Sequence, residues 1–178
     1  TGSYRYSMRS PFRANFGAAY TLRNFAVLSV DYEFADYGSM RYSTEDYDRD
    51  YFEDVNNEIR ECFGVSHIIR IGAEVKPFSG LAIRAGYRAA TSPELYDSWG
   101  EKLPVSKTQN LSFGLGYSSK NSFFADLAVR KTIMPKEYFM PYADYMFDAD
   151  GVIESAYAPE VMISRNQWKV LLTFGWRF

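Results

Sequence analysis

The stretch VSHIIRIGAEVKPFSGLAIRAGYRAA, residues 65–90, decides the fold, because it holds two long alternations of residue type joined by a short connection. Every second residue from Val65 to Val75, and again from Leu81 to Ala89, is apolar or aromatic, with His67 as the exception. Such a period of two predicts β-strands with one apolar face. The apolar positions keep their parity across Pro77-Phe78-Ser79. An odd turn of three residues therefore joins two antiparallel strands that share a face.

The same alternation recurs along the chain and predicts seven strands. They lie at about residues 11–22, 25–37, 63–76, 81–90, 108–118, 122–132 and 165–178. Two further tight turns are predicted at Arg23-Asn24-Phe25 and Ser119-Lys120-Asn121. The other connections are long, at about residues 38–62, 91–107 and 133–164. Tight turns and long loops thus alternate strictly from one end of the chain to the other.

Composition excludes several classes of function. The 178 residues carry 20 Lys+Arg against 22 Asp+Glu, a formal net charge of −2, so no basic surface for nucleic acid is expected. One cysteine rules out an intrachain disulfide and paired-cysteine chemistry, and one histidine removes most zinc sites, so we predict no metal centre and no cofactor. Aromatic residues make up 18% of the chain, which is high for a soluble domain.

Alternation alone fits both a soluble β-sandwich and a transmembrane β-barrel. Four features favour the barrel. The predicted strands have about 10–13 residues, whereas ordinary strands have about 5–6 and a tilted membrane strand needs about 9–11. The polar faces mix Gly, Ser and Ala with isolated charges of both signs, and the apolar faces carry aromatic residues near their ends. The alternating connection lengths match periplasmic turns and extracellular loops. We therefore predict an all-β, antiparallel transmembrane β-barrel of the outer-membrane type.

The strand count predicts that this barrel is incomplete. If tight turns are periplasmic and long loops extracellular, residue 11 starts on the extracellular side and Phe178 ends in the periplasm. Bacterial single-chain barrels have an even number of strands. Seven strands therefore predict that residues 1–178 are the C-terminal part of one barrel domain, whose N-terminal strands are missing.

Several short segments, in order along nearly the whole chain, resemble the FadL-type outer-membrane transporters, and most of all their Bacteroidetes-like versions of the hemin-receptor or hydrocarbon-transporter type. The segments are Ser10-Pro11, Gly17-Ala18-Ala19-Tyr20, Asp31-Tyr32, Asp36-Tyr37, Arg70-Ile71-Gly72-Ala73-Glu74 with Pro77, Arg84-Ala85-Gly86-Tyr87 and Gly175-Trp176-Arg177-Phe178. The resemblance implies the outer membrane of a Gram-negative bacterium and a 14-stranded barrel, of which this chain is half. It also implies an N-terminal plug and a kinked strand in the front half, neither of which maps onto these residues.

The resemblance further implies a passive transporter or channel for hydrophobic small molecules such as long-chain fatty acids. The alternative is a structural or adhesive barrel whose long extracellular loops bind a partner. An enzyme is disfavoured, because the single histidine, His67, has apolar-face parity and its neighbour Ser66 points to the other face. Expected partners are membrane lipid and lipopolysaccharide, a hydrophobic ligand and the barrel-assembly machinery.

Charged residues on the polar faces are the candidate site. The predicted ligand contacts are the arginines that would face the lumen and could attract a ligand carboxylate. They are Arg70, Arg84, Arg88 and Arg130. The alternative is a network in which the inward charges only pair with one another, and the sequence leaves both open.

The chain ends on an alternating strand whose apolar face is expected to meet lipid. By resemblance this strand is also the signal read by the barrel-assembly machinery, carried by Trp168, Val170, Leu172, Phe174, Trp176 and Phe178. Two loops invite further hypotheses. The acidic segment Glu45–Glu61 could hold a divalent cation, but its carboxylates lack the spacing of a Ca²⁺ loop, so a solvated loop is favoured. The segment YFMPYADYMF, residues 138–147, could capture apolar ligands or pack over the rim.

Overall fold

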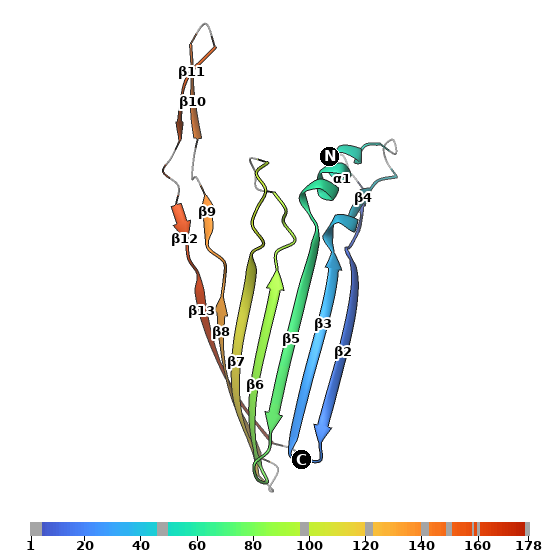
Figure 1. Cartoon of the computed structure of the whole chain (residues 1–178), viewed down its shortest axis with the longest axis vertical. Helices are drawn as coiled ribbons and strands as arrows, with labels where there is room; N and C mark the ends of the chain where they lie inside the picture. The colour runs from blue at the N-terminus through green and yellow to red at the C-terminus, as the bar shows by residue number, and fades with distance from the viewer. Residues whose placement is uncertain are drawn as a thin grey trace.

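The computed structural model contains one seven-stranded antiparallel sheet, with the order β13-β8-β7-β6-β5-β3-β2 (Figure 1). The structure describes residues 5–45, 50–96, 100–119, 123–139, 143–148, 151–157, 159 and 161–176. The strands of this sheet are β2 (Phe12–Leu22), β3 (Ala26–Asp36), β5 (Val65–Val75), β6 (Leu81–Thr91), β7 (Lys107–Ser118), β8 (Phe123–Ile133) and β13 (Asn166–Trp176). Each begins and ends within two residues of its predicted bounds. Phe178 lies outside the described residues.

The register keeps the two faces of the sheet separate along its whole length. Pairing between neighbouring strands runs without a shift. At the turn end Leu22 pairs with Ala26, so three residues separate them as predicted. The predicted three-residue turn is too short at the second hairpin, where Val75 pairs with Ile83. Seven residues lie between these two, which is again an odd number, so the parity argument holds although the turn length was wrong.

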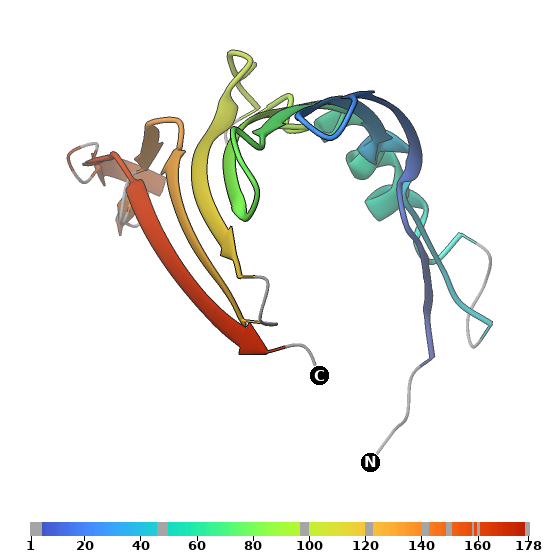
Figure 2. The same cartoon turned by 90° about the horizontal axis from the view of Figure 1, so that it is seen from below.

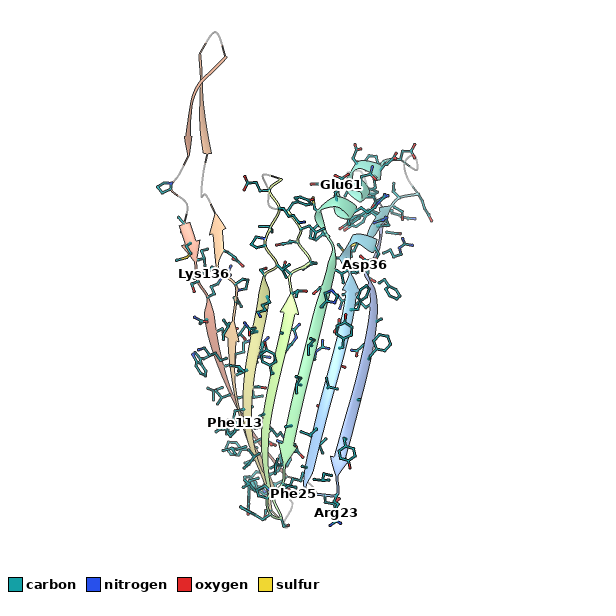
Figure 3. The ribbon with its side chains drawn as sticks, viewed as in Figure 1. Arg23, Phe25, Asp36, Glu61, Phe113 and Lys136 are labelled. Carbon is teal, nitrogen blue, oxygen red and sulfur yellow. The ribbon has the colours of Figure 1, made fainter. Side chains whose placement is uncertain are left out.

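The sheet is curved into an open arc (Figure 2). The buried residues of the sheet all lie on its concave face, because the curvature brings the side chains of that face closer together. They are Glu33, Ala35, Ser66, Ala82, Gly114, Gly116 and Thr132. The convex face carries the large apolar side chains, such as Phe16, Val170 and Trp176, which are 64–68% exposed. Figure 3 shows side chains standing along the whole sheet, with Phe113 partway up and Arg23 and Phe25 at the turn end.

The first long connection, expected as a loop, contains ordered structure instead. It holds a 3₁₀ turn η1 (Tyr37–Ser39), β4 (Arg41–Ser43) and the helix α1 (Glu53–Cys62), and β4 pairs with the short strand β1 (Ser7–Arg9). Asn56 on α1 binds the backbone of Tyr42 on β4, since its side-chain amide accepts from the Tyr42 N–H at 2.8 Å and donates to the Tyr42 carbonyl at 2.9 Å. Glu53 and Asp54 in the first helical turn complement the helix dipole. Figure 3 places Glu61 at this rim of the sheet.

The last long connection also contains strands that alternation did not predict. The strands β9 (Glu137–Phe139) and β12 (Val161–Ile163) pair with each other, and β10 (Ala143–Asp148) with β11 (Gly151–Tyr157). The β10–β11 hairpin reaches beyond the rest of the rim (Figure 1). Residues 140–142 of the YFMPYADYMF segment lie outside the described residues. No helix among the described residues is long and apolar enough to cross a membrane.

The second hairpin allows a test of its turn geometry. Gly80 has a φ of +92°, and a Cβ there would lie 2.6 Å from the Ser118 carbonyl oxygen. Gly100 has a φ of +79°, but a Cβ there would meet nothing within 4 Å. We expect Gly80→Ala to lower the free energy of unfolding by about 1–2 kcal/mol more than Gly100→Ala, because only the first adds a clash to the unfavourable φ. Urea unfolding of the refolded full-length protein measures this difference, and equal losses would contradict it.

Candidate functional site: the concave face

An arginine on β6 joins three strands at the turn end of the concave face. Arg84 donates from Nε to Glu74 on β5 and from Nη1 to Asp126 on β8, each at 2.6 Å. The strand between β6 and β8 is β7, which has a glycine at this point: a Cβ at Gly116 would lie 2.5 Å from the Asp126 Oδ1 and 2.9 Å from the Arg84 Nη1. Lys76 adds a contact to Glu74 at 3.1 Å. Both carboxylates are therefore neutralised by neighbouring cations.

A second network lies closer to the rim. Arg70 on β5 forms ion pairs with two carboxylates of β3, Asp31 and Glu33, the latter at 2.5 Å. Arg13 on β2 approaches Glu33 at 3.6 Å. The Glu33 side chain is 12% exposed, and burial of a carboxylate is unfavourable unless a partner cation compensates for the lost hydration. The ion pairs with Arg70 and Arg13 compensate for the burial of the Glu33 carboxylate inside the arc.

Between the two networks the concave face is hollowed. The cavity has a volume of about 390 Å³, and its floor is made of small residues. Gly72 pairs with Gly86, which in turn pairs with Ser112. The polar lining comes from neighbouring positions on the four strands β5 to β8, namely Arg70, Arg88, Asn110, Ser112 and Arg130. Of the two glycines, Gly86 lines the cavity, and the lack of a side chain there leaves room between the longer residues.

Two guanidinium groups in this cavity have no carboxylate partner among the described residues. They belong to Arg88 and Arg130. The side-chain carbonyl of Asn110 accepts a hydrogen bond from Thr132 at 2.7 Å, which leaves the Asn110 NH₂ group free to donate. Arg88 stands directly opposite Arg70 in the register, so like charges face each other there. The cavity thus offers hydrogen-bond donors and positive charge, the combination that a carboxylate or phosphate ligand needs.

The concave face concentrates positive charge although the whole chain has a net charge of −2. Among the described inward residues of the seven strands, the anions are Asp31, Glu33, Glu74 and Asp126. The cations are Arg13, Arg70, Arg84, Arg88, Arg130 and Lys169. Six cations against four anions leave a surplus of two positive charges on this face.

The structure separates the four arginines that the sequence grouped together. Arg70, Arg88 and Arg130 line one cavity, whereas Arg84 lies outside it and is held by its two carboxylates. Sequence reasoning missed Asn110 as a lining residue, although its parity placed it on the polar face. Only the register, which pairs Asn110 with Arg88, shows that it lies beside the arginines.

The convex face holds the other predicted residues. The side chains of the closing strand are 58–68% exposed at Trp168, Val170, Leu172, Phe174 and Trp176. His67 also lies on this face, where its Nδ1 is 2.7 Å from the Tyr32 hydroxyl oxygen and its ring stacks on that of Tyr32. The neighbouring Ser66 points to the concave side and donates to the Thr91 carbonyl at 2.6 Å. Histidine and serine are therefore on opposite faces, as the alternation predicted.

Comparison with known proteins supports the fold. A crystal structure of a FadL homologue from Pseudomonas aeruginosa aligns with a TM-score of 0.52 and 14% sequence identity. The alignment covers 95% of this chain and 36% of the homologue's chain, so this chain spans about a third of that protein. No family model matches the sequence, and no curated protein matches it either. The fold is thus an open portion of a FadL-like antiparallel β-barrel.

The two networks and the unpaired arginines should respond differently to mutation. Arg70→Ala leaves Asp31 and Glu33 close together with only Arg13 nearby, so we expect the free energy of unfolding to fall by about 1–2 kcal/mol, less than for a fully buried pair. Arg88→Ala removes a cation that faces Arg70 and should change stability by less than about 0.5 kcal/mol. Denaturant unfolding of the refolded protein compares the two variants, and a larger loss for Arg88→Ala would refute this assignment.

Proposed function

We propose that the protein is a passive transporter of the Gram-negative outer membrane that carries amphipathic small molecules with a negatively charged group, such as long-chain fatty acids. The observation that supports this most directly is the division of the sheet: an exposed apolar convex face and a concave face with a surplus of positive charge. A transmembrane barrel needs apolar side chains toward lipid and polar ones toward its lumen. The remaining strands of the barrel would come from the rest of the protein, pairing with the open edges β2 and β13.

The spacing of aromatic residues on the closing strand fits a membrane. Trp168 and Trp176 lie eight residues apart on the same convex face of β13. Eight residues at about 3.3 Å each span about 26 Å along the strand, or about 20 Å of membrane thickness at a tilt of about 40°. Tryptophan rings favour the two interfaces of a membrane. The apolar band between them is therefore close to the height of about 25 Å expected of outer-membrane barrels.

Inside the barrel, the cavity with Arg88 and Arg130 is the proposed contact for the ligand's charged group. Each guanidinium can donate two parallel hydrogen bonds to a carboxylate. The ion pairs of Arg70 and Arg84 make those two residues parts of the wall, so they support the site rather than bind the ligand. Transport then needs no covalent chemistry, because the protein supplies only a route past the polar surface of the membrane.

Two further parts of this proposal concern assembly and the alternative function. The closing strand, Asn166–Trp176 together with Phe178, would serve as the signal for the barrel-assembly machinery. The β10–β11 hairpin, which extends beyond the rim, is the feature that favours the alternative, an adhesive barrel that binds a partner at the cell surface. Flux across a membrane separates the two functions, since an adhesive barrel needs none.

Uptake of a labelled fatty acid by vesicles that contain the full-length protein tests transport. We expect saturable uptake above that of empty vesicles. The double variant Arg88→Ala/Arg130→Ala should raise the half-saturating concentration about ten- to hundredfold, because it removes charge-assisted hydrogen bonds. The fatty acid methyl ester, which has no negative charge, serves as the matched ligand and should be affected little by the substitutions.

Each result has a defined meaning. Flux no greater than that of empty vesicles would overturn transport and leave the adhesive barrel. Normal flux with an unchanged half-saturating concentration in the double variant would keep the transporter and overturn the arginine site. Arg84→Lys is the control on the same face, since it keeps a positive charge beside the two carboxylates and lies outside the cavity.

The two faces of β8 test whether the convex side meets lipid. Leu127 lies on the convex face in the middle row between the two tryptophan levels, opposite Leu172, and Ala128 lies on the concave face. Leu127→Arg should lower the free energy of unfolding in lipid vesicles by about 2–4 kcal/mol, since it places a charge near the membrane centre. Ala128→Arg should lower the free energy of unfolding by less than about 1 kcal/mol. Reversed costs, measured by urea unfolding in vesicles, would show that the sheet is oriented the other way.

A further inference from the structure

A lysine on the convex face stands at the edge of the apolar band. Lys131 on β8 pairs with Trp168 on β13 and with Leu111 on β7, and its Nζ lies 5.4 Å from the centre of the Trp168 ring. The next convex residue of β8 toward the turn end is Val129. Lys131 is thus the deepest cation on the convex face among the described strand residues, at the level of the tryptophan nearer the rim.

The surroundings of Lys131 donate hydrogen bonds but offer little to accept them. Gln109 and Asn166 both pair with Ile133, the next convex residue toward the rim, so they lie diagonally from Lys131, one on each neighbouring strand. The Gln109 carbonyl already accepts from the Tyr87 hydroxyl at 2.9 Å, which leaves its amide to donate. Among the described convex residues of β6, β7, β8 and β13 there is no carboxylate. The ammonium group therefore has an aromatic neighbour and no anionic partner.

The position and the chemistry together suggest what occupies this patch. If the sheet spans a membrane as proposed above, the level of Trp168 is the interface on the side of the long loops, which faces the outside. The outward leaflet of an outer membrane is built of phosphorylated glycolipid. Its phosphates complement Lys131, its sugar hydroxyls match the amides of Gln109 and Asn166, and its sugar rings can lie against the indole of Trp168, which is 63% exposed.

We propose that Lys131, Trp168, Gln109 and Asn166 form a binding site for the phosphorylated sugar headgroup of an outer-leaflet glycolipid. The proposal rests on the membrane-spanning orientation proposed above, but not on transport. A phospholipid headgroup has the phosphate without the sugar rings, so the amides and the exposed indole face favour the glycolipid. Bound there, the lipid would seal the barrel wall beside its closing strand.

Native mass spectrometry of the full-length protein in detergent tests the site, with diphosphoryl lipid A as the probe. Lys131→Met keeps the length of the side chain and removes the charge, and it should weaken lipid A binding about ten- to hundredfold. Lys131→Arg should restore most of the binding. Lys169→Met is the matched control, because Lys169 is the neighbour of Trp168 in sequence but points to the concave face, and it should leave binding unchanged. Folding of each variant is checked by the heat-dependent mobility of the barrel on gels.

Two other lipids are compared with lipid A to define the chemistry of the ligand. Dephosphorylated lipid A should bind the unaltered protein as weakly as lipid A binds the Lys131→Met variant. Phosphatidylglycerol should also bind more weakly than lipid A. Equal binding of either lipid, or unchanged lipid A binding by Lys131→Met, would overturn the site while leaving transport untouched. If the unaltered protein shows no fatty acid flux above empty vesicles but binds lipid A in a way that depends on Lys131, transport is overturned and the lipid site is supported.

Discussion

The parity of the strand register is the constraint on which the rest of the structure depends. The turns after β2 and β5 leave an odd number of residues, three and seven, between their paired ends, so a face that is apolar on one strand stays apolar on the next. A connection one residue longer or shorter would turn every side chain of the following strand to the other face. The apolar convex surface, the ion pairs and the cavity all follow from a register that keeps the apolar residues of the seven strands on one face.

On the concave face, positions without side chains matter as much as the charged residues. Arg84 reaches Asp126 two strands away because the intervening strand has Gly116 at the crossing. Gly86 similarly leaves room in the cavity beside Arg88. Exposed ion pairs contribute at most about 1 kcal/mol each, so these contacts add little to stability by number alone. Their main effect is to determine which cations are neutralised and which are left available to a ligand.

The sequence predicted the sheet well because alternation is a local signal. Bounds such as Phe12–Leu22 and the two faces follow from residue type at every second position. Helix α1 was missed, since its sequence is rich in carboxylates and it is held by contacts such as that of Asn56 with Tyr42, which are distant in sequence. The candidate site was predicted only in part. Parity placed Arg84 and Arg88 on one face, but only the three-dimensional register shows that Arg84 is paired with two carboxylates and Arg88 with none.

The unpaired arginines fit a site that must release its ligand as well as attract it. Arg88 faces Arg70, and mutual repulsion between them is relieved when an anion enters the cavity. Asp31 and Glu33 already neutralise most of the charge of Arg70, so an entering carboxylate meets a moderate surplus of charge and not three free guanidinium groups. A channel needs binding that is favourable enough for entry and weak enough for exit. In the transporter proposed above, the acidic partners on β3 limit the attraction of the site, so the pairing of Arg70 matters for passage as well as the freedom of Arg88.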